Sequence, residues 1–198
     1  MRNKIITSTV WEDDSMDPTG WWMSEKYDGM RLFWNGAAFF TRQGRKLKVP
    51  LSIVSQMPNI SLDGELWTQY GLVQEPIQLS RTLDTNKWRK AIFWIFDAPD
   101  IAHQPYEERL QYLKNLQKSE TLPKFVKIID TVKCEGKEHL HRYLVEVVAK
   151  GGEGVMLREP GSLYRGGRSP SLRKFKEYLD TEVKVIQNNY PYGFNCVQ

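Results

Sequence analysis

The chain contains 198 residues, 40% hydrophobic and 26% charged, a composition typical of one folded domain that excludes a disordered or fibrous chain. Its formal net charge of +4 only hints at a polyanionic partner. Two cysteines, Cys134 and Cys196, are too few for a metal-binding set or a disulfide scaffold. No apolar run could span a membrane, and no signal-peptide core follows the N-terminus. We therefore expect an intracellular protein (cytoplasmic, nuclear or nucleoid) that binds no membrane, although an exported mature form would look the same.

The first twenty residues are interpreted as a lead-in with an acidic cluster. Residues that favour strands then flank a polar loop, with Trp21–Met23 before it and Met30–Trp34 after it. Asn35-Gly36 is the preferred dipeptide of a two-residue hairpin turn, so the second strand of a hairpin is expected over Ala37–Thr41.

The middle of the chain alternates short predicted elements. A short helix is expected over 51–57, a strand with a kink at Gly64 over 60–67, and a buried central strand over 92–96, where the residues are apolar. Helices with apolar stripes are expected over 106–117 and 138–150. Strand-like segments cover 125–132, 153–157 and 172–186. Strands and helices mix without regular βαβ alternation, which predicts an α+β domain of mainly antiparallel sheets flanked by helices.

The polar loop after the first predicted strand contains Lys26-Tyr27-Asp28-Gly29. A lysine at a strand end beside an acidic residue and a glycine is placed to meet a substrate. Taken alone, however, this tetrapeptide is a weak signal, and an exposed loop lysine would be its ordinary interpretation.

Four later stretches combine charged groups with strand ends, turns or glycines. Arg42 lies in a turn suited to bidentate phosphate contact. Leu62–Glu65 places two carboxylates around a glycine, and Glu153 lies among three glycines, where backbone can approach a ligand closely. Lys174 and Lys176 alternate and are expected on one strand face. Two such lysines opposite carboxylates are the pattern expected for a nucleoside triphosphate with its magnesium.

In series, these stretches resemble the covalent nucleotidyltransferases and, within them, the ATP-dependent DNA ligases. The Lys26 loop, with Arg31, is similar to the nucleophile motif of that family. The later motifs follow in the family's order over residues 21–186, at Thr41–Gly44, Leu62–Glu65, Phe93–Asp97, Glu153–Arg158 and Lys174–Lys176. The form of Glu153–Arg158 and the 164–169 loop are more similar to DNA ligases than to RNA ligases or capping enzymes.

The resemblance implies an ATP-grasp-like nucleotidyltransferase domain of the ligase and capping-enzyme type. It implies an adenylation domain over residues 1–186 and, over 187–198, a connection towards an oligonucleotide-binding (OB) domain that this sequence does not contain. A basic motif of that OB domain orients the pyrophosphate in family members, so slow self-adenylation is expected of this chain alone.

The implied chemistry is nick sealing. Lys26 attacks the α-phosphate of ATP to form lysyl-AMP, the AMP passes to the 5′-phosphate of nicked double-stranded DNA, and the 3′-hydroxyl displaces it. The attacking amine must be neutral, whereas a free lysine is protonated at neutral pH. Desolvation, Mg²⁺, Lys174 and Lys176 are expected to favour the neutral form. The implied catalytic residues are therefore Lys26, Lys174 and Lys176.

The resemblance also implies binding roles, in which Glu65 contacts the ribose and Phe96 stacks on the adenine. The nucleotide-binding set is Ser24, Glu25, Lys26, Arg31, Glu65, Phe96, Lys174 and Lys176. The carboxylates implied for Mg²⁺ are Glu153 and Glu65. The phosphate contacts to DNA are assigned to Arg42, Arg45, Lys46 and Lys48. Phe93, Trp94 and Ile95 are expected in the core.

Three alternatives stay open at this point: an RNA ligase, a GTP-using capping enzyme, and a module that binds nicked or nucleotide-bearing nucleic acid without turnover. A monomer is expected, and the pathway served among DNA replication, repair and recombination stays open.

Overall fold

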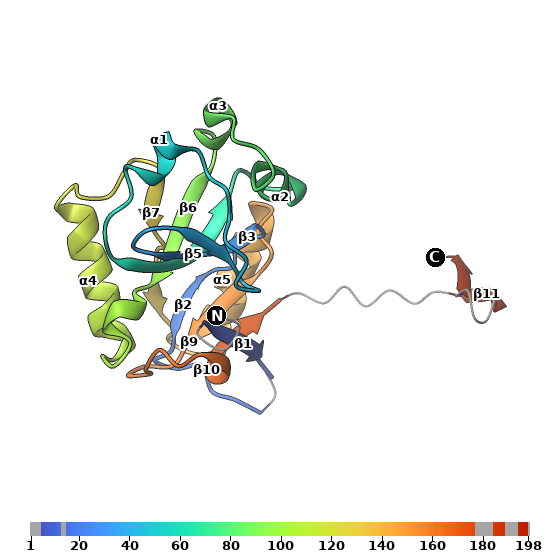
Figure 1. Cartoon of the computed structure of the whole chain (residues 1–198). Helices are drawn as coiled ribbons and strands as arrows, with labels where there is room; N and C mark the ends of the chain where they lie inside the picture. The colour runs from blue at the N-terminus through green and yellow to red at the C-terminus, as the bar shows by residue number, and fades with distance from the viewer. Residues whose placement is uncertain (1–4, 13–14, 177–183, 189–193, 198) are drawn as a thin grey trace.

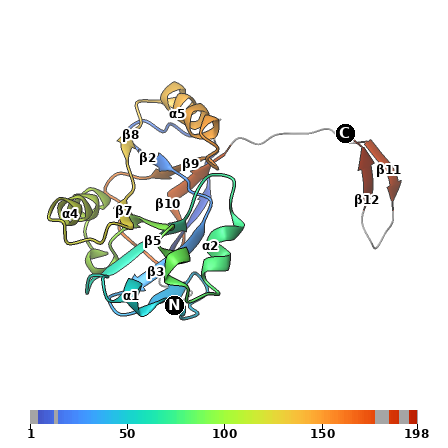
Figure 2. The same ribbon diagram turned by 90° about the horizontal axis from the view of Figure 1, so that it is seen from above.

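The structure is a computed structural model that describes residues 5–12, 15–176, 184–188 and 194–197. Its body consists of two five-stranded sheets with helices packed against them (Figures 1 and 2). The predicted α+β class with mainly antiparallel sheets is confirmed, because all but two of the strand pairings within these sheets are antiparallel.

The first sheet begins, in chain order, directly after the Lys26 loop, which joins it to the second sheet. Its strands lie in the order β4 (Phe39–Thr41), β3 (Met30–Asn35), β5 (Ser61–Trp67), β6 (Ile92–Asp97) and β7 (Val126–Ile128). Only β6 and β7 run parallel to each other. The predicted kink at Gly64 is present as a shift in the β5–β6 register between Asp63 and Gly64.

The second sheet joins the two ends of the domain. Its strands lie in the order β1 (Ile6–Val10), β10 (Gly167–Phe175), β9 (Val155–Arg158), β2 (Trp22–Glu25) and β8 (Val132–Lys133). Here β1 runs parallel to β10, and the other pairings are antiparallel.

The helices bury one face of each sheet. Core residues of the first sheet such as Trp34 and Phe93 pack with Leu113 of α4 (Tyr106–Lys118). Met23 and Leu157 of the second sheet pack with Leu140 of α5 (Lys137–Ala149). The shorter helices are α1 (Leu51–Val54), α2 (Gln74–Leu79), α3 (Thr85–Trp88) and the 3₁₀ turn η1 (Pro99–Ile101).

A smaller antiparallel pair is formed by β11 (Lys184–Asn188) and β12 (Phe194–Val197). The strand predicted over 172–186 therefore corresponds to two strands, the last part of β10, which ends at Phe175, and the first part of β11. Residues 177–183 between them lie outside the described residues. The connection predicted over 187–198 falls partly on 189–193 and 198, which also lie outside them, as do Asp13 and Asp14 of the acidic cluster. Among the described residues no helix is long and apolar enough to cross a membrane.

Four sequence-based expectations about the elements were wrong. The lead-in contains β1, which pattern reasoning missed because its partner, β10, lies about 160 positions away in sequence. β10 begins at Gly167, so the predicted 164–169 loop belongs partly to a strand that was expected to start only at residue 172. The predicted strand over 125–132 divides into β7 and β8, which lie in different sheets. The 92–96 strand lies inside the first sheet, between β5 and β7, as expected, but it buries only alternate residues because its other face borders a cavity.

The hairpin turn is also displaced by one residue. Asn35 remains in β3, its backbone N–H donating to the carbonyl oxygen of Ala38 at 3.2 Å. Its side-chain oxygen accepts hydrogen bonds from the backbone N–H groups of Ala37 and Ala38 at 3.0 and 2.8 Å. Gly36, with φ of +89°, and Ala37 therefore form the turn, and the second strand starts at Phe39.

Candidate active site

A cavity of about 510 Å³ lies between the two sheets, a size typical of small-ligand sites. Its walls come from both sheets, because the faces not buried against helices turn toward it. The residues that line it include Ser24, Lys26, Arg31, Arg42, Glu65, Phe96, Met156 and Arg158.

The Lys26 loop is fixed by close backbone packing. The backbone N–H of Lys26 donates to the carbonyl oxygen of Gly154 at 2.8 Å, which extends the β2–β9 pairing to the loop. A Cβ on Gly29 would overlap the carbonyl oxygen of Leu66, so this position requires glycine. The ring of Tyr27 stacks on Trp94 with centroids 4.7 Å apart and planes 11° apart. Lys26 is thereby held at the mouth of the cavity.

The carboxylate of Glu153 lies between two lysine ammonium groups. One oxygen pairs with Lys26 Nζ and the other with Lys176 Nζ. The three side chains are 20–28% exposed, so a ligand can reach them. Burial alone would raise the pKa of Glu153, but hydrogen bonds from Lys176 and Lys26 outweigh it and hold this pKa below its ordinary value. In the unliganded site Glu153 is therefore an anion paired with two cations.

The glycine after Glu153 allows this arrangement. Gly154 has φ of +152°, and a Cβ there would press on the carbonyl oxygen of Phe175, at the end of β10. Close approach of these two segments brings Lys176 to Glu153. Lys174 pairs in register with Met156, which lines the cavity, so Lys174 lies on the cavity face of the sheet, whereas Lys176 follows the last residue of β10. Lys174 forms no ion pair with a carboxylate of the described residues.

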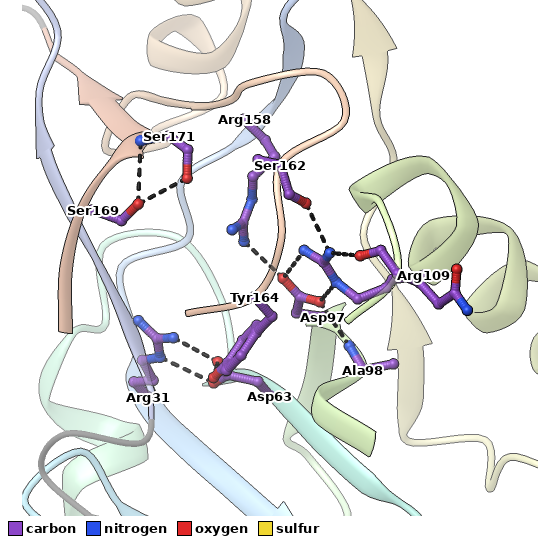
Figure 3. A network of polar contacts seen from close by, with 11 residues as sticks. Arg31, Asp63, Asp97, Ala98, Arg109, Arg158, Ser162, Tyr164, Ser169 and Ser171 are labelled. Atoms are coloured by element: carbon purple, nitrogen blue, oxygen red, sulfur yellow. Dashed lines mark hydrogen bonds and ion pairs between the residues drawn. The ribbon is translucent and has the colours of Figure 1, made fainter. Parts of the chain in front are cut away.

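Arg31 is held by a buried carboxylate. Its Nε and Nη2 donate to the two oxygens of Asp63 at 3.0 and 2.6 Å, and the hydroxyl of Tyr164 donates to the same carboxylate at 2.6 Å (Figure 3). Asp63 is fully buried. The guanidinium of Arg31 also lies 5.0 Å from the ring centroid of Phe96. Arg31 and Phe96 therefore form one wall of the cavity.

A second buried carboxylate, Asp97, lies at the end of β6. Arg109 of α4 donates to its two oxygens from Nε and Nη2 at 2.6 and 3.2 Å, and Arg158 of β9 donates from Nη2 at 2.9 Å (Figure 3). Nη1 of Arg109 donates to the carbonyl oxygens of Gln104 and Ser162. Nη1 of Arg158 is buried and has no hydrogen-bond partner among the described residues. Asp97 thus ties α4 to both sheets.

Glu65 has the most perturbed carboxyl group bordering the cavity. Burial raises its pKa to about 8, although Arg31 and Lys26 oppose the shift. Arg31, Glu65 and Trp94 lie side by side in register across β3, β5 and β6. A carboxyl group in this position changes protonation near neutral pH, so a bound cation would favour its charged form.

The structure brings most of the predicted site residues together, with some exceptions. Arg45, Lys46 and Lys48 are exposed but do not line the cavity, unlike Arg42. The carboxylate of Glu25 accepts a hydrogen bond from Tyr70 at 3.2 Å, so only part of this residue borders the cavity. Trp94 was expected in the core but lies on the opposite sheet face, against Tyr27, whereas Phe93 and Ile95 are buried as expected.

Several residues of the site were missed by sequence reasoning. Tyr27 occupies the variable position of the Lys-x-Asp-Gly loop, where the sequence gives no role. Asp97, Arg158 and Tyr164 were within recognised motifs but were assigned nothing. Arg109 did carry a signal, because it falls on the apolar stripe of α4, where an arginine must find a buried partner.

Comparison with known proteins agrees with this geometry. The fold and the cavity between its sheets are those of a nucleotidyltransferase domain. The family model described as "ATP dependent DNA ligase domain" matches residues 6–176, and the chain belongs to this family.

Individual relatives support the same family. A curated DNA ligase of Haemophilus influenzae is 32% identical over 174 residues, which are 88% of this chain and 64% of that protein. A structure from a study of Lig E DNA ligases has a TM-score of 0.83 and 29% identity, and the match covers 92% of this chain and 72% of that one. The Chlorella virus DNA ligase-adenylate has a TM-score of 0.74 at 24% identity over 92% and 72% of the two chains, a likeness of fold. This chain thus spans just under two thirds of the curated relative.

Proposed function

We propose that this chain is the adenylation domain of an ATP-dependent DNA ligase, with Lys26 as its nucleophile. The observation that supports this most directly is the Glu153 carboxylate held between Lys26 and Lys176 at the mouth of the cavity. Membership in the ATP-dependent ligase family supports ATP as the nucleotide. The domain extends at least over the matched residues 6–176, and we propose that it acts as a monomer.

The first step forms lysyl-AMP. Lys26 Nζ, after losing a proton, attacks the α-phosphorus of ATP; a P–N bond forms, the P–O bond to the β-phosphate breaks, and pyrophosphate leaves. Lys26 and Lys176 share the Glu153 carboxylate in the unliganded site. The triphosphate gives Lys176 a new partner, and Mg²⁺ held by Glu153 would reduce the negative charge that favours the protonated form of Lys26, whose proton passes to solvent. Lys174, on the same face, adds a cation beside the leaving pyrophosphate.

The later steps return the lysine. An oxygen of the DNA 5′-phosphate attacks the same phosphorus, the P–N bond breaks, and Lys26 leaves as an amine that takes up a proton. The 3′-hydroxyl then attacks the 5′-phosphorus and AMP leaves. In this scheme Arg42 contacts the nick phosphates, a role supported by its exposure at the cavity wall, and the wall formed by Arg31 and Phe96 receives the ribose and base.

The residues present fit Mg²⁺. The described residues hold no group of three or more acidic, His or Cys side chains able to form a complete metal site. Mg²⁺, however, usually takes one or two carboxylates together with substrate phosphates and water. Glu153 and Glu65 supply those carboxylates, and bound Mg²⁺ would neutralise charge on the triphosphate.

A sealing assay tests the proposal. The protein should join nicked duplex DNA with ATP and Mg²⁺, and Lys26→Ala and Lys26→Arg should both abolish joining, because an arginine stays protonated and cannot attack. Lys118→Ala, an exposed lysine on α4, is the matched control and should seal normally. Preference for GTP would indicate a capping-type enzyme, and preference for an RNA nick an RNA ligase. Binding of nicked DNA without joining would leave only a binding module.

A further inference from the structure

A second hollow, of about 760 Å³, opens at the far edge of the first sheet, where β7 ends it. Its walls are α1, α3, the start of β6 and the segment leading into β7, and Figure 1 shows α1 and α3 together at one end of the molecule. A hydrogen bond of 3.0 Å between Ser52 and Thr85 links these two helices. Four basic side chains line this hollow, Arg89, Lys90, Lys124 and Lys127. We call these four residues the β7 basic group.

The charges of the β7 basic group are uncompensated. All four side chains are exposed, and no acidic side chain lines the hollow. None of the four forms an ion pair with a carboxylate among the described residues. The chain as a whole has only four more basic than acidic residues, so such a gathering of like charge is not a general property of its surface. Uncompensated cations around a concave surface attract a polyanion.

The β7 basic group begins on the same sheet face as the active site. Arg31, Glu65, Trp94 and Lys127 lie in one row of register partners across β3, β5, β6 and β7. Since neighbouring strands are about 4.8 Å apart, Lys127 lies about 10 Å along this row from Glu65. The Nζ of Lys127 is 5.7 Å from the Trp94 ring centroid, and Trp94 stacks on Tyr27, next to the nucleophile.

The other basic segment of the chain lies at the opposite edge of the same sheet. Arg42, Arg45, Lys46 and Lys48 follow β4, and the sheet order places β4 and β7 at its two ends. Four strand spacings separate these edges, about 19 Å. At about 3.4 Å between phosphates of one strand, this is the length of about six base pairs. The nucleophile loop lies between the two basic edges.

We propose that the β7 basic group binds the phosphate backbone of one duplex arm beside the nick, while the segment after β4 contacts the nick and the other arm. This inference rests on the proposed function and adds a DNA contact to it. The aromatic residue that lines the hollow, Phe125, packs against the core of the first sheet, so the lysine and arginine side chains favour phosphate contact, which is independent of base sequence. The binding should therefore be electrostatic and should weaken with salt.

Charge reversal tests the proposal. The double variant Lys124→Glu/Lys127→Glu should make the slope of log affinity against log salt less steep by about 1.8, because each of two lost phosphate contacts contributes about 0.9. The loss of affinity between about 50 and 200 mM salt should then be about tenfold smaller than in the wild type. The matched control, Lys114→Glu/Lys118→Glu on α4, changes the net charge equally and should leave the slope near that of the wild type. Equal slopes for the two variants would overturn the proposal.

Two further measurements separate this inference from the proposed function. Lysine adenylation without DNA should be equal in wild type and double variant, and its absence from the wild type would contradict the proposed function itself. Shortening one duplex arm to fewer than about six base pairs should abolish the difference between the double variant and the wild type, whereas shortening the other arm should preserve it. A difference that persists with either arm shortened, or full competition by single-stranded DNA, would contradict a duplex-arm site.

Discussion

Two groups of ion pairs border the same cavity and differ in exposure. The Lys26–Glu153–Lys176 group is 20–28% exposed, whereas the carboxylates of Asp63 and Asp97 are fully buried. Charges in the first group can exchange partners with an incoming triphosphate. Those in the second cannot, because removing a partner would leave a buried charge uncompensated. From this difference we expect Glu153 to take part in the reaction, and Asp63 and Asp97 to hold the cavity in shape.

The largest expected effect is on stability, at Asp97. Asp97→Ala removes the partner of Arg109 and of Arg158 Nη2, and we expect a loss of about 3–5 kcal/mol in the free energy of unfolding. Denaturant unfolding measures it. Asp130→Asn, an exposed carboxylate, is the control and should stay within about 0.5 kcal/mol of the wild type. A loss at Asp97 no larger than at Asp130 would remove the distinction between the two groups.

At Glu153 we expect a large effect on the reaction and little effect on stability. Glu153→Gln should slow single-turnover lysine adenylation about a hundredfold, equivalent to about 2.7 kcal/mol in the barrier, because charge at the metal and at both lysines is lost. The thermal midpoint should change little, since this side chain is partly exposed. Wild-type adenylation at limiting Mg²⁺ in this variant would argue against a metal role.

A substitution of Arg42 tests whether this arginine contacts the DNA or the nucleotide. Arg42→Ala should slow sealing of a pre-adenylated nick about tenfold, the effect of about 1.4 kcal/mol of lost phosphate contact, while lysine adenylation stays near normal because it uses no DNA. Arg142→Ala is the matched control, since this exposed arginine on α5 lines neither the cavity nor the second hollow. Impaired adenylation with intact sealing in Arg42→Ala would assign this arginine to the nucleotide instead.

The smallest expected effect is the pH dependence at Glu65. Its pKa, raised by burial to about 8, exceeds its ordinary value of 4.5, so the folded state holds this proton more tightly than the unfolded state. Stability should therefore fall as pH rises from about 4.5 to 8, and Glu65→Gln should remove this part of the slope. A full shift of this size would correspond to about 5 kcal/mol, but Glu65 is only partly buried and solvent screens its charge. We therefore expect the variant to be more stable than the wild type above pH 8 by about 1 kcal/mol, or 2–4 °C, and equal to it below pH 4.5.

Thermal melts over this pH range measure the effect, with Glu146→Gln on the exposed face of α5 as the control. Equal slopes for the wild type and Glu65→Gln would show that Glu65 titrates normally.

Local pattern was sufficient for much of this fold. Apolar stripes at helical spacing predicted the helices Tyr106–Lys118 and Lys137–Ala149, and the glycine at position 64 predicted the irregularity in β5. β1 was missed because a parallel pairing between the two ends of a domain leaves no local trace. The turn was displaced because Asn35 can cap a turn from its first position as well as occupy its centre.

The candidate site was predictable where charge stands beside glycine or at a strand end. Lys26, Glu153 and Lys176 all have that signature. The role of Asp97 was not predictable, because it depends on Arg109 and Arg158, which approach from two different elements. Sequence patterns identify charged residues in unusual positions. Only the fold shows which cations share a carboxylate and whether that ion pair is buried or open to a ligand.

Intact-mass measurement of the protein after incubation with ATP and Mg²⁺ tests the central claim most directly. The account predicts a single added AMP, located on Lys26 by peptide mapping, reduced in Glu153→Gln and absent from Lys26→Ala. An unmodified mass after prolonged incubation, or an adduct that persists in Lys26→Ala, would contradict it.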